Sequence, residues 1–403
     1  MLQFNQDDFI RRHVTHRAES MFLHDLANNQ ETLRAAIAGK SVLVIGGAGT
    51  IGSSFIKALL PYRPGKLTVV DYSENGLTEL TRDLRSAHQQ YLPAHYLTYP
   101  FDFGGAIFAK LYRQGDYDLV ACFAAHKHVR SEKDHLAIEA MVRNNVFNTK
   151  KLLDLCLERP PAHFFCVSTD KAANPVNVMG ASKKLMEQVL MSYTDRLKIS
   201  TARFANVAFS NGSLLFGFQH RIMKRQPLSS PADVRRYFVS PIESGQLCLL
   251  ACVLGNSRDV IFPKLREDQM LTFSSIAERF LAAIGLQPDH CATEDEARAK
   301  AAAWQPGNPL YPVYFFKTGT SGEKLYEEFY TQTDRVNLDR FLALGVVENS
   351  PRESSAAIAG KLAEFERMFA QKSLDKAQII ALLGRHLADF SHVETGRSLD
   401  QQI

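Results

Sequence analysis

The sequence predicts an α/β protein with a doubly wound parallel sheet, a smaller C-terminal lobe and extra helices at both ends of the chain. Short apolar strands alternate with amphipathic helices between residues 41 and 206, which is the pattern of repeated strand–helix–strand units. The strands are apolar along their whole length, as expected when helices cover both faces of a sheet. A glycine-rich turn follows the first strand. With 403 residues, 45% of them hydrophobic, the chain can bury a sizeable core.

Four regions are expected along the chain. Residues 1–40 form an N-terminal helical extension, which could pack on the main domain or on a second subunit. Residues 41–206 form the main sheet domain, residues 207–335 mainly the smaller lobe, and residues 336–403 a C-terminal helical extension. Expected strands cover residues 41–45, 66–70, 95–99, 119–123, 163–167 and 199–203, and expected helices cover 50–60, 74–87, 138–157, 182–194, 352–371 and 374–389, the last with Ser373 as its N-cap.

The composition excludes several classes of protein. The net charge of +4, with acidic and basic residues interspersed, is too small to indicate nucleic-acid binding. The six cysteines are scattered with no Cys-x-x-Cys pair, so buried reduced thiols are expected and a metal site is not. The N-terminus is too polar for a signal peptide, and no apolar run reaches the ~18 residues that span a bilayer. We therefore expect a cytoplasmic protein with no membrane partner.

The glycine turn predicts a dinucleotide site of the Rossmann type. Gly46, Gly49 and Gly52 have the spacing G-x-x-G-x-x-G, directly after a strand and at the start of a helix. Glycines let the backbone turn tightly and approach a pyrophosphate. Thr50 and Ile51 then place unpaired N–H groups of the helix N-terminus beside that pyrophosphate.

An acid at the tip of the second strand favours NAD as the cofactor. Asp71 is placed to bond the adenosine ribose hydroxyls. NADP stays possible, because Arg82 or Arg85 on the following helix could reach a 2′-phosphate. The residues after the third and fourth strands could also line the cofactor site, or could be ordinary turn and packing residues: Asp102, Phe103, Ala124 and Ala125.

A second polar segment follows the fifth strand, at the edge where open α/β sheets bind ligands. Asp170 and Lys171 are adjacent there, so they could act as an acid and a base, or form a solvated salt-bridging turn. Lys183 could bond the nicotinamide ribose, or lie on the surface. Met179 stands four residues before Lys183, where a tyrosine would complete a familiar redox pair.

These motifs resemble those of a known family. The likeness lies in GGAGTIGS (46–53), DYSENGL (71–77), AAHKHV (124–129), RNNVFNT (143–149), STDKAANPVNVMGASK (168–183), RFANVAFSNGS (203–213), RRYFVSPIES (235–244) and SGEKLYEE (321–328). In this order they resemble segments of the extended short-chain dehydrogenase/reductases, and most closely the polysaccharide-biosynthesis branch with its UDP-N-acetylglucosamine 4,6-dehydratases. The resemblance covers about residues 41–330.

The resemblance implies a UDP-sugar substrate and a substrate-binding role for the smaller lobe. Family members oxidise C4 of the sugar by hydride transfer to bound NAD(P)+, eliminate water across C5 and C6, and return the hydride to C6. The resemblance assigns the O4 contact to Thr169, the acid to Asp170, the C5 base to Lys171 and the ribose contact to Lys183. Further implied contacts to the substrate are Lys127, His128, Asn206, Ser213, Arg236 (for the phosphates), Lys317 and Glu323.

Two departures bear on this assignment. Met179 cannot take the C4 hydroxyl proton, so Thr169, Asp170 or a water must relay it. Thr320 and Ser321 replace the family's Arg-Pro, which removes an arginine for the diphosphate unless Lys317 compensates. A nucleotide-sugar epimerase or ketoreductase on the same scaffold is the alternative activity, and a catalytically silent NAD-binding scaffold is the alternative of another class. Family members commonly associate through helices, so a homo-oligomer is expected.

Overall fold

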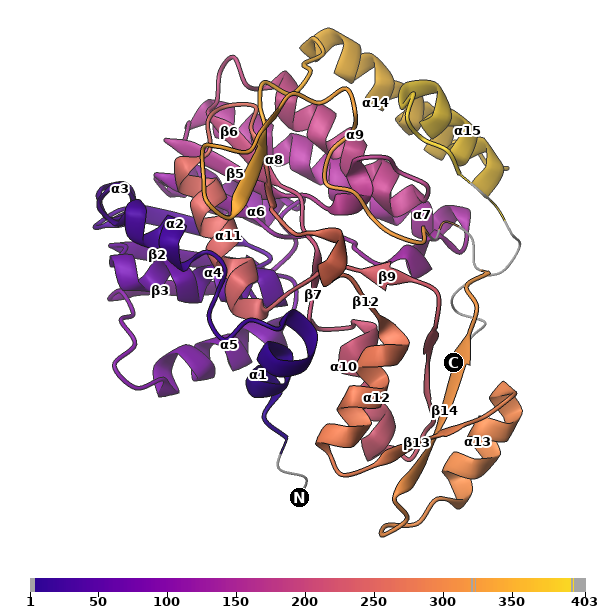
Figure 1. The fold of residues 1–403 in the computed structure, drawn as a ribbon. Coiled ribbons are helices and arrows are strands. Elements are labelled where there is room, and N and C mark those ends of the chain that lie inside the picture. Colours follow the sequence, from indigo (N-terminus) through magenta and orange to yellow (C-terminus); the bar gives the residue numbers. More distant parts are fainter. Residues whose placement is uncertain (1–3, 320–321, 323, 393, 395–403) are drawn as a thin grey trace.

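The computed structural model describes residues 4–319, 322, 324–392 and 394. Its largest element is a nine-stranded sheet with the strand order β15-β16-β11-β6-β5-β4-β1-β2-β3 (Figure 1). Neighbouring strands from β3 to β11 are parallel, and β16 and β15 extend the edge in antiparallel orientation. Chain order reverses between β1 and β4, which confirms the doubly wound sheet and makes this place the topological switch point. The strands are β1 (Ser41–Ile45), β2 (Lys66–Asp71), β3 (His95–Pro100), β4 (Leu119–Cys122), β5 (His163–Val167), β6 (Ile199–Ala202), β11 (Val260–Pro263), β15 (Val336–Asn337) and β16 (Leu344–Val347).

Helices cover both faces of the sheet because its strands are apolar on both sides. Val42 and Val44 of β1 lie in one core with side chains of α4, α5 and α11. Leu43 and Ile45 alternate with them and lie in the other core, with side chains of α6, α7, α8 and α9. These helices are α4 (Thr50–Leu59, continued by the 3-10 turn η2, Leu60–Tyr62), α5 (Glu74–Ser86), α6 (Ala106–Gln114), α7 (His135–Val142), α8 (Asn148–Glu158), α9 (Val178–Ser192) and α11 (Pro241–Leu254).

Two of the predicted helices differ from the observed ones. The helix expected at residues 138–157 is α7 and α8 joined by a π-helical segment, η4 (Arg143–Phe147). The helix expected to begin at residue 182 begins at Val178, because the side chain of Asn177 accepts a hydrogen bond from the Gly180 nitrogen at 2.7 Å and caps it. Lys183 therefore lies in the second turn of this helix and does not open it.

The smaller lobe has its own core. Its parallel sheet has the order β13-β14-β8, and α10 and α12 pack against it around Phe218, Phe280 and Tyr311. Two further short ladders pair β7 with β10 and β9 with β12. The elements are β7 (Asn206–Val207), α10 (Leu214–Met223), β8 (Leu228–Pro231), β9 (Arg235–Arg236), β10 (Phe238–Val239), η6 (Glu267–Gln269), β12 (Leu271–Thr272), α12 (Phe273–Ala283), β13 (Gln287–His290), α13 (Glu294–Ala303) and β14 (Leu310–Phe316).

The N-terminal extension packs on its own chain. Phe9 lies edge-on to Phe209 and Phe280 in the core of the smaller lobe. The buried carboxylate of Asp25 accepts hydrogen bonds from the backbone nitrogens of Leu342 and Ala343, at 2.7 and 2.8 Å. These contacts fix the extension to the smaller lobe and to the segment before β16. It consists of α1 (Gln6–Phe9), the π-helical η1 (Ile10–Thr15), α2 (Leu23–Asn28) and α3 (Gln30–Ile37).

The C-terminal region is helical only from Ser355 onward. Residues 336–347, expected within a helical extension, instead contribute β15 and β16 to the main sheet, because the run Leu344–Val347 is fully buried beside β11. Helices α14 (Ser355–Phe369) and α15 (Lys376–His386) pack beside α9 and α7 (Figure 1). The N-cap of α15 is Asp375, which forms a capping box with Gln378, and not Ser373.

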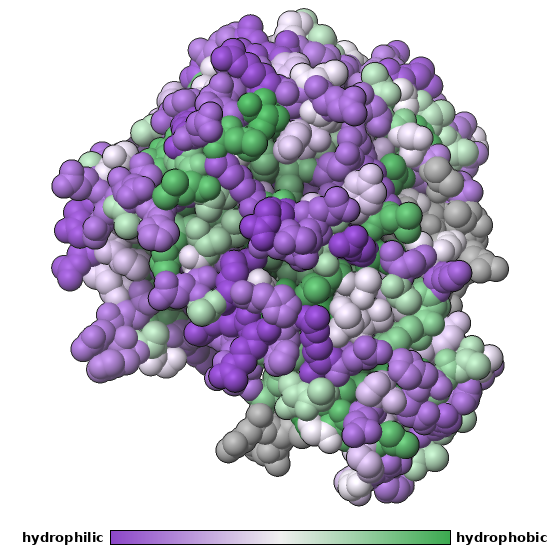
Figure 2. Space-filling model, viewed as in Figure 1, coloured by the Kyte–Doolittle hydropathy of each residue, from purple (hydrophilic) through white to green (hydrophobic). Residues whose placement is uncertain are grey.

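Hydrophilic side chains cover most of the face shown in Figure 2, and apolar residues appear between them in smaller groups. In the part of the chain that the structure describes, no helix has both the length and the apolar character needed to cross a bilayer.

Candidate functional site

The glycine turn lies between β1 and α4, against the end of β4. Gly46 has a φ of +75°, which favours glycine, and a Cβ there would lie 2.5 Å from the Ala124 nitrogen. A Cβ on Gly52 would lie 2.3 Å from the Gly46 carbonyl oxygen. Gly49 is the N-cap of α4, so the free N–H groups of this helix, from Thr50 onward, lie at the carboxyl edge of the sheet. This arrangement fits the pyrophosphate of a dinucleotide.

Asp71 ties the glycine turn to the end of β2. Its Oδ2 accepts a hydrogen bond from the Ala48 nitrogen at 3.0 Å, and its Oδ1 accepts one from the Ser73 nitrogen at 2.9 Å. Each carboxylate oxygen can accept a further bond, so ribose hydroxyls could still bind there. Arg82, one of the two arginines considered for a 2′-phosphate, pairs with Glu79 on its own helix. The contacts of Asp71 therefore fit NAD.

Asp102 and Phe103, which follow β3, contact residues close to them in the sequence. Asp102 Oδ1 accepts a hydrogen bond from the Gly104 nitrogen at 2.9 Å, and Phe103 is buried edge-on to Phe108. Phe103 therefore belongs to the core and does not present an open ring. A contact of Asp102 with the adenine stays a prediction. Ala125 and Ile51 are half-buried, close in sequence to Ala124 and Gly52 respectively.

The polar groups of the segment after β5 meet at one oxygen atom. Thr169 Oγ1 donates to Asp170 Oδ1 at 2.9 Å, and Lys171 Nζ donates to the same oxygen at 3.0 Å. The 3-10 turn η5 (Asp170–Ala172) also brings the Lys171 nitrogen to this oxygen, at 2.9 Å. Asp170 is buried, whereas the Lys171 side chain keeps 16% of its exposure. An acid and a base thus share one hydrogen-bonded site at the edge of the sheet.

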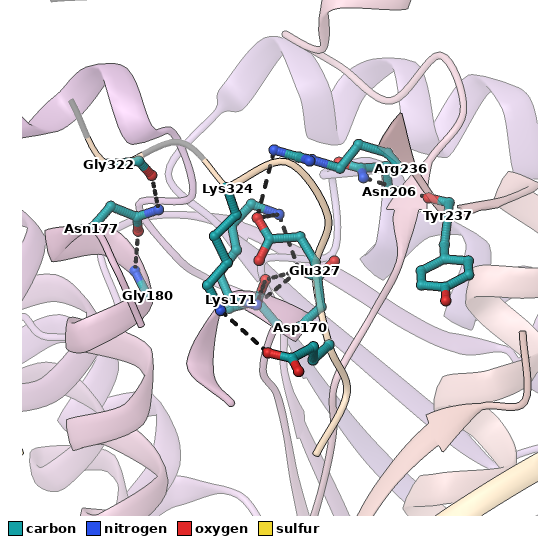
Figure 3. Close-up of polar contacts among 12 residues, drawn as sticks. Asp170, Lys171, Asn177, Gly180, Asn206, Arg236, Tyr237, Gly322, Lys324 and Glu327 are labelled. Atoms are coloured by element: carbon teal, nitrogen blue, oxygen red, sulfur yellow. Dashed lines mark hydrogen bonds and ion pairs between the residues drawn. The ribbon is translucent and has the colours of Figure 1, made fainter. Parts of the chain in front are cut away.

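A second carboxylate faces Lys171 from a segment far away in the sequence. Glu327 Oε1 lies 3.6 Å from Lys171 Nζ and 3.7 Å from Nη2 of Arg236, as Figure 3 shows. Burial alone would lower the pKa of Lys171, but the carboxylates of Asp170 and Glu327 outweigh burial and raise it. Burial raises the pKa of Glu327. Arg236 is itself buried and donates to the carbonyl oxygens of Arg235 and Leu325, so it is fixed in place.

Helix α9 places Met179 and Lys183 next to this segment. Met179 is buried in the core that α9 shares with α7 and α8. Lys183 Nζ donates to the Val167 carbonyl oxygen, at the end of β5, at 2.7 Å, and lies 3.1 Å from the Met186 sulfur. Lys183 is therefore not a surface lysine. Its ammonium lies at the carboxyl edge of the sheet, bonded to Val167, which stands two residues before Thr169.

Three residues that support the site were not predicted. The buried side chain of Asn145 accepts from the His126 nitrogen at 2.8 Å and donates to the Ser182 hydroxyl at 3.0 Å, so it joins the loop after β4 to α9. The Glu132 carboxylate, in the 3-10 segment η3 (Val129–Glu132), accepts from the first nitrogen of α9. Glu327 is the third. Asn145 and Glu327 lie in segments that carry the family likeness, which was the available signal.

The residues predicted to contact substrate divide into two groups. Arg236 joins the Lys171 cluster, and Asn206 lies on β7, where its side chain donates to the Tyr237 carbonyl oxygen at 3.4 Å. By contrast, the Ser213 hydroxyl caps α10, and Lys317 is exposed just after β14. Glu323 lies outside the described residues.

The loop after β4 lines a cavity of about 470 Å³. His126 and His128 border it, together with Gly212 from the smaller lobe. Lys127 Nζ donates to the Asn211 carbonyl oxygen at 3.0 Å, and the Asn211 nitrogen donates to the Thr50 hydroxyl at 2.9 Å. Lys127 thus links the loop to the smaller lobe beside the glycine turn.

The fold is that of the extended short-chain dehydrogenase/reductases, a class that includes nucleotide-sugar dehydratases and epimerases. The chain belongs to the family described as polysaccharide biosynthesis protein, whose model matches residues 42–347.

Curated relatives support this membership. The chain is 31% identical over 317 residues to an uncharacterized membrane protein of Methanocaldococcus jannaschii, covering 76% of this chain and 85% of the relative. It is 26% identical over 238 residues to the inverting UDP-N-acetylglucosamine 4,6-dehydratase of Campylobacter jejuni, covering 56% and 67%. With the probable polysaccharide biosynthesis protein EpsC of Bacillus subtilis it shares 27% identity over 73% of this chain but spans only 48% of the relative.

Solved structures show the same fold. The dTDP-glucose 4,6-dehydratase DesIV of Streptomyces venezuelae superposes with a TM-score of 0.55 at 18% identity, over 81% of this chain and 97% of that one.

Proposed function

We propose that this protein is a nucleotide-sugar 4,6-dehydratase that acts on UDP-N-acetylglucosamine or a close relative of it. The observation that carries the proposal is the shared hydrogen bonding of Thr169, Asp170 and Lys171 at the carboxyl edge of the sheet. Elimination of water beside a ketone needs an acid and a base within one pocket, and these side chains supply both. The likeness to the Campylobacter dehydratase supports the UDP-sugar as substrate class.

The same geometry offers a path for the C4 hydroxyl proton. A sugar O4 bound at Thr169 Oγ1 would be one hydrogen bond away from Asp170 Oδ1. The proton could then pass from O4 through the threonine hydroxyl to the carboxylate of Asp170. This path does not need the tyrosine that Met179 replaces. Asp170 would carry the proton until the C6 hydroxyl leaves, and would protonate it to release water.

Lys171 is the base for the C5 proton in this proposal. As a neutral amine, Lys171 would take the proton from C5, next to the new C4 ketone, and hold it as an ammonium between Asp170 and Glu327. It would return this proton to C5 when C6 receives the hydride. The C5 proton and the C4 hydride thus both return to the sugar, at C5 and C6 respectively. The 4-keto-6-deoxy product differs from the substrate by the loss of one water.

The cofactor that fits the site is NAD. When bound, NAD supplies the acceptor for the C4 hydride and the donor that returns it to C6. The turn with Gly46 and Gly52 would hold the pyrophosphate and Asp71 the adenosine ribose. Lys183, at the end of β5, would hold the nicotinamide ribose in exchange for its bond to the Val167 carbonyl oxygen.

Mass spectrometry tests the proposal. The full chain is incubated with NAD and UDP-N-acetylglucosamine, and the nucleotide sugar is analysed. The proposal predicts a product lighter by one water. A product of unchanged mass but altered stereochemistry would identify an epimerase. Absence of turnover across UDP-, GDP-, CDP- and dTDP-sugars, with NAD bound, would identify a silent scaffold.

A further inference from the structure

One buried acid, Glu327, connects the base Lys171 to the smaller lobe. It lies on the segment after β14, 156 residues beyond Lys171 in the sequence, and its side chain is only 3% exposed. One oxygen, Oε1, lies within 4 Å of both Lys171 Nζ and the Arg236 guanidinium, at 3.6 and 3.7 Å. Figure 3 shows the carboxylate between the two cations. A buried carboxylate needs such partners, because burying an unpaired charge is costly.

The backbone around Glu327 holds it there. The Arg235 nitrogen donates to the Leu325 carbonyl oxygen at 2.9 Å, and Arg236 Nη1 donates to the same oxygen at 3.2 Å. Two residues beyond Glu327, the Phe329 carbonyl oxygen accepts from Arg203 at 2.8 Å. The segment is thus fixed on both sides of Glu327, so the position of its carboxylate is built into the fold.

We propose that Glu327 is a positioning residue of the active site, which holds Lys171 in place and stabilises its ammonium after the lysine has taken the C5 proton. This inference rests on the proposed function, in which Lys171 is the C5 base. Among the described residues, the charged groups that act on the Glu327 carboxylate include Lys171, Asp170, Arg236 and Lys324. Of these, Lys171 and Asp170 change charge during the proposed reaction, and Lys171 is the one that forms an ion pair with Glu327, at 3.6 Å.

The role of Glu327 follows from the charges around Lys171. Two carboxylates favour the ammonium form of Lys171, while burial and Arg236 oppose it. Since a base with a higher pKa binds a proton more strongly, Glu327 makes Lys171 a stronger base for an unreactive C–H proton. The higher pKa also leaves a larger fraction of Lys171 protonated before substrate binds. The reaction rate should therefore increase as the pH rises toward the Lys171 pKa.

The test compares Glu327→Gln with two other variants of the full chain. Glu327→Asp keeps the charge, and Glu328→Gln removes the charge of the adjacent residue, whose side chain is 45% exposed and pairs with Lys324. Protein labelled with ¹³C at lysine Cε is titrated by NMR without substrate, and the Lys171 signal is identified by its loss in Lys171→Arg. Rates of product formation are then measured against pH.

Glu327→Gln should move the Lys171 midpoint down by at least about one pH unit, because a unit charge at 3.6 Å has a Coulomb effect of that size even in water, and Glu327 is buried. In the plot of reaction rate against pH, the rising limb should move to lower pH together with this midpoint. The maximal rate at high pH should fall. Glu327→Asp should titrate closer to wild type, and Glu328→Gln should match wild type. A Lys171 midpoint in Glu327→Gln equal to that in Glu328→Gln would overturn the inference. If wild type removes no water from any nucleotide sugar, the proposed function fails, while the NMR titration still decides whether Glu327 acts on Lys171.

Discussion

The buried ion pair of Glu187 and Arg203 is predicted to stabilise the edge of the sheet that carries the site. Arg203 Nε and Nη2 donate to the two carboxylate oxygens of Glu187, at 3.0 and 2.8 Å, and the Ser168 hydroxyl donates to Oε1 at 2.6 Å. Both charged side chains are buried. Because Ser168 directly precedes Thr169, the pair fixes the start of the proposed catalytic segment.

Glu187→Gln keeps the shape of the side chain and removes its charge. Loss of one partner of a buried pair costs about 3–5 kcal/mol, because the other charge stays buried without compensation. Asp334 Oδ2 lies 3.7 Å from Arg203 Nη1 and would still offset part of that charge. We therefore expect a loss at the lower end, about 3 kcal/mol, which is about a hundredfold in the folding equilibrium.

Urea unfolding measures this loss as a lower midpoint with an unchanged slope. The control is Glu158→Gln, which breaks the two-bonded pair of Glu158 with Arg113 on the surface, and should leave the midpoint almost unchanged. Burial would raise the pKa of Glu187, but Arg203 outweighs burial and lowers it. The difference between wild type and Glu187→Gln should thus be complete above the unfolded pKa of about 4.3 and shrink as the pH falls below it. Equal midpoints for the two variants would refute this reasoning.

Three further predictions concern the site. Gly52→Ala should lower the melting temperature and abolish NAD binding in calorimetry, because its Cβ would lie 2.3 Å from the Gly46 oxygen. The control Gly49→Ala, whose Cβ would have its nearest contact at 3.4 Å, should melt like wild type. Equal melting temperatures for the two variants would contradict this prediction. Asp71 should make NAD bind at least about tenfold more tightly than NADP, since a 2′-phosphate would face its carboxylate, and tighter NADP binding would exclude that role. Lys171→Ala should lose dehydration and keep NAD binding, and full activity would remove Lys171 as the C5 base.

Local sequence features predicted the parts of the site that local structure builds. The glycine turn and Asp71 follow their strands directly, so alternation and spacing were sufficient to place them. The predicted start of α9 lies four residues too late, because the prediction does not use Asn177 as the N-cap, although Asn is a favoured residue there. The prediction places residues 344–347 in a helical region, because four apolar residues do not distinguish a strand from a helix.

The contacts that complete the site could not be predicted from periodicity. Glu327 meets Lys171 only because the segment after β14 crosses back to the end of β5. Asn145 reaches both His126 and Ser182 from the π-helical segment between α7 and α8, where the register of the helix changes. Such meetings depend on the packing of distant segments, and a single sequence shows the residues without their neighbours.

A deuterium label tests the central claim most directly. UDP-N-acetylglucosamine carrying deuterium at C4 is incubated with the full chain and NAD, and the product is analysed by mass spectrometry and NMR. We expect loss of one water, with the deuterium retained and found on C6. Loss of water with deuterium washed out, or deuterium still on C4 of an unreacted or epimerised sugar, would contradict the account.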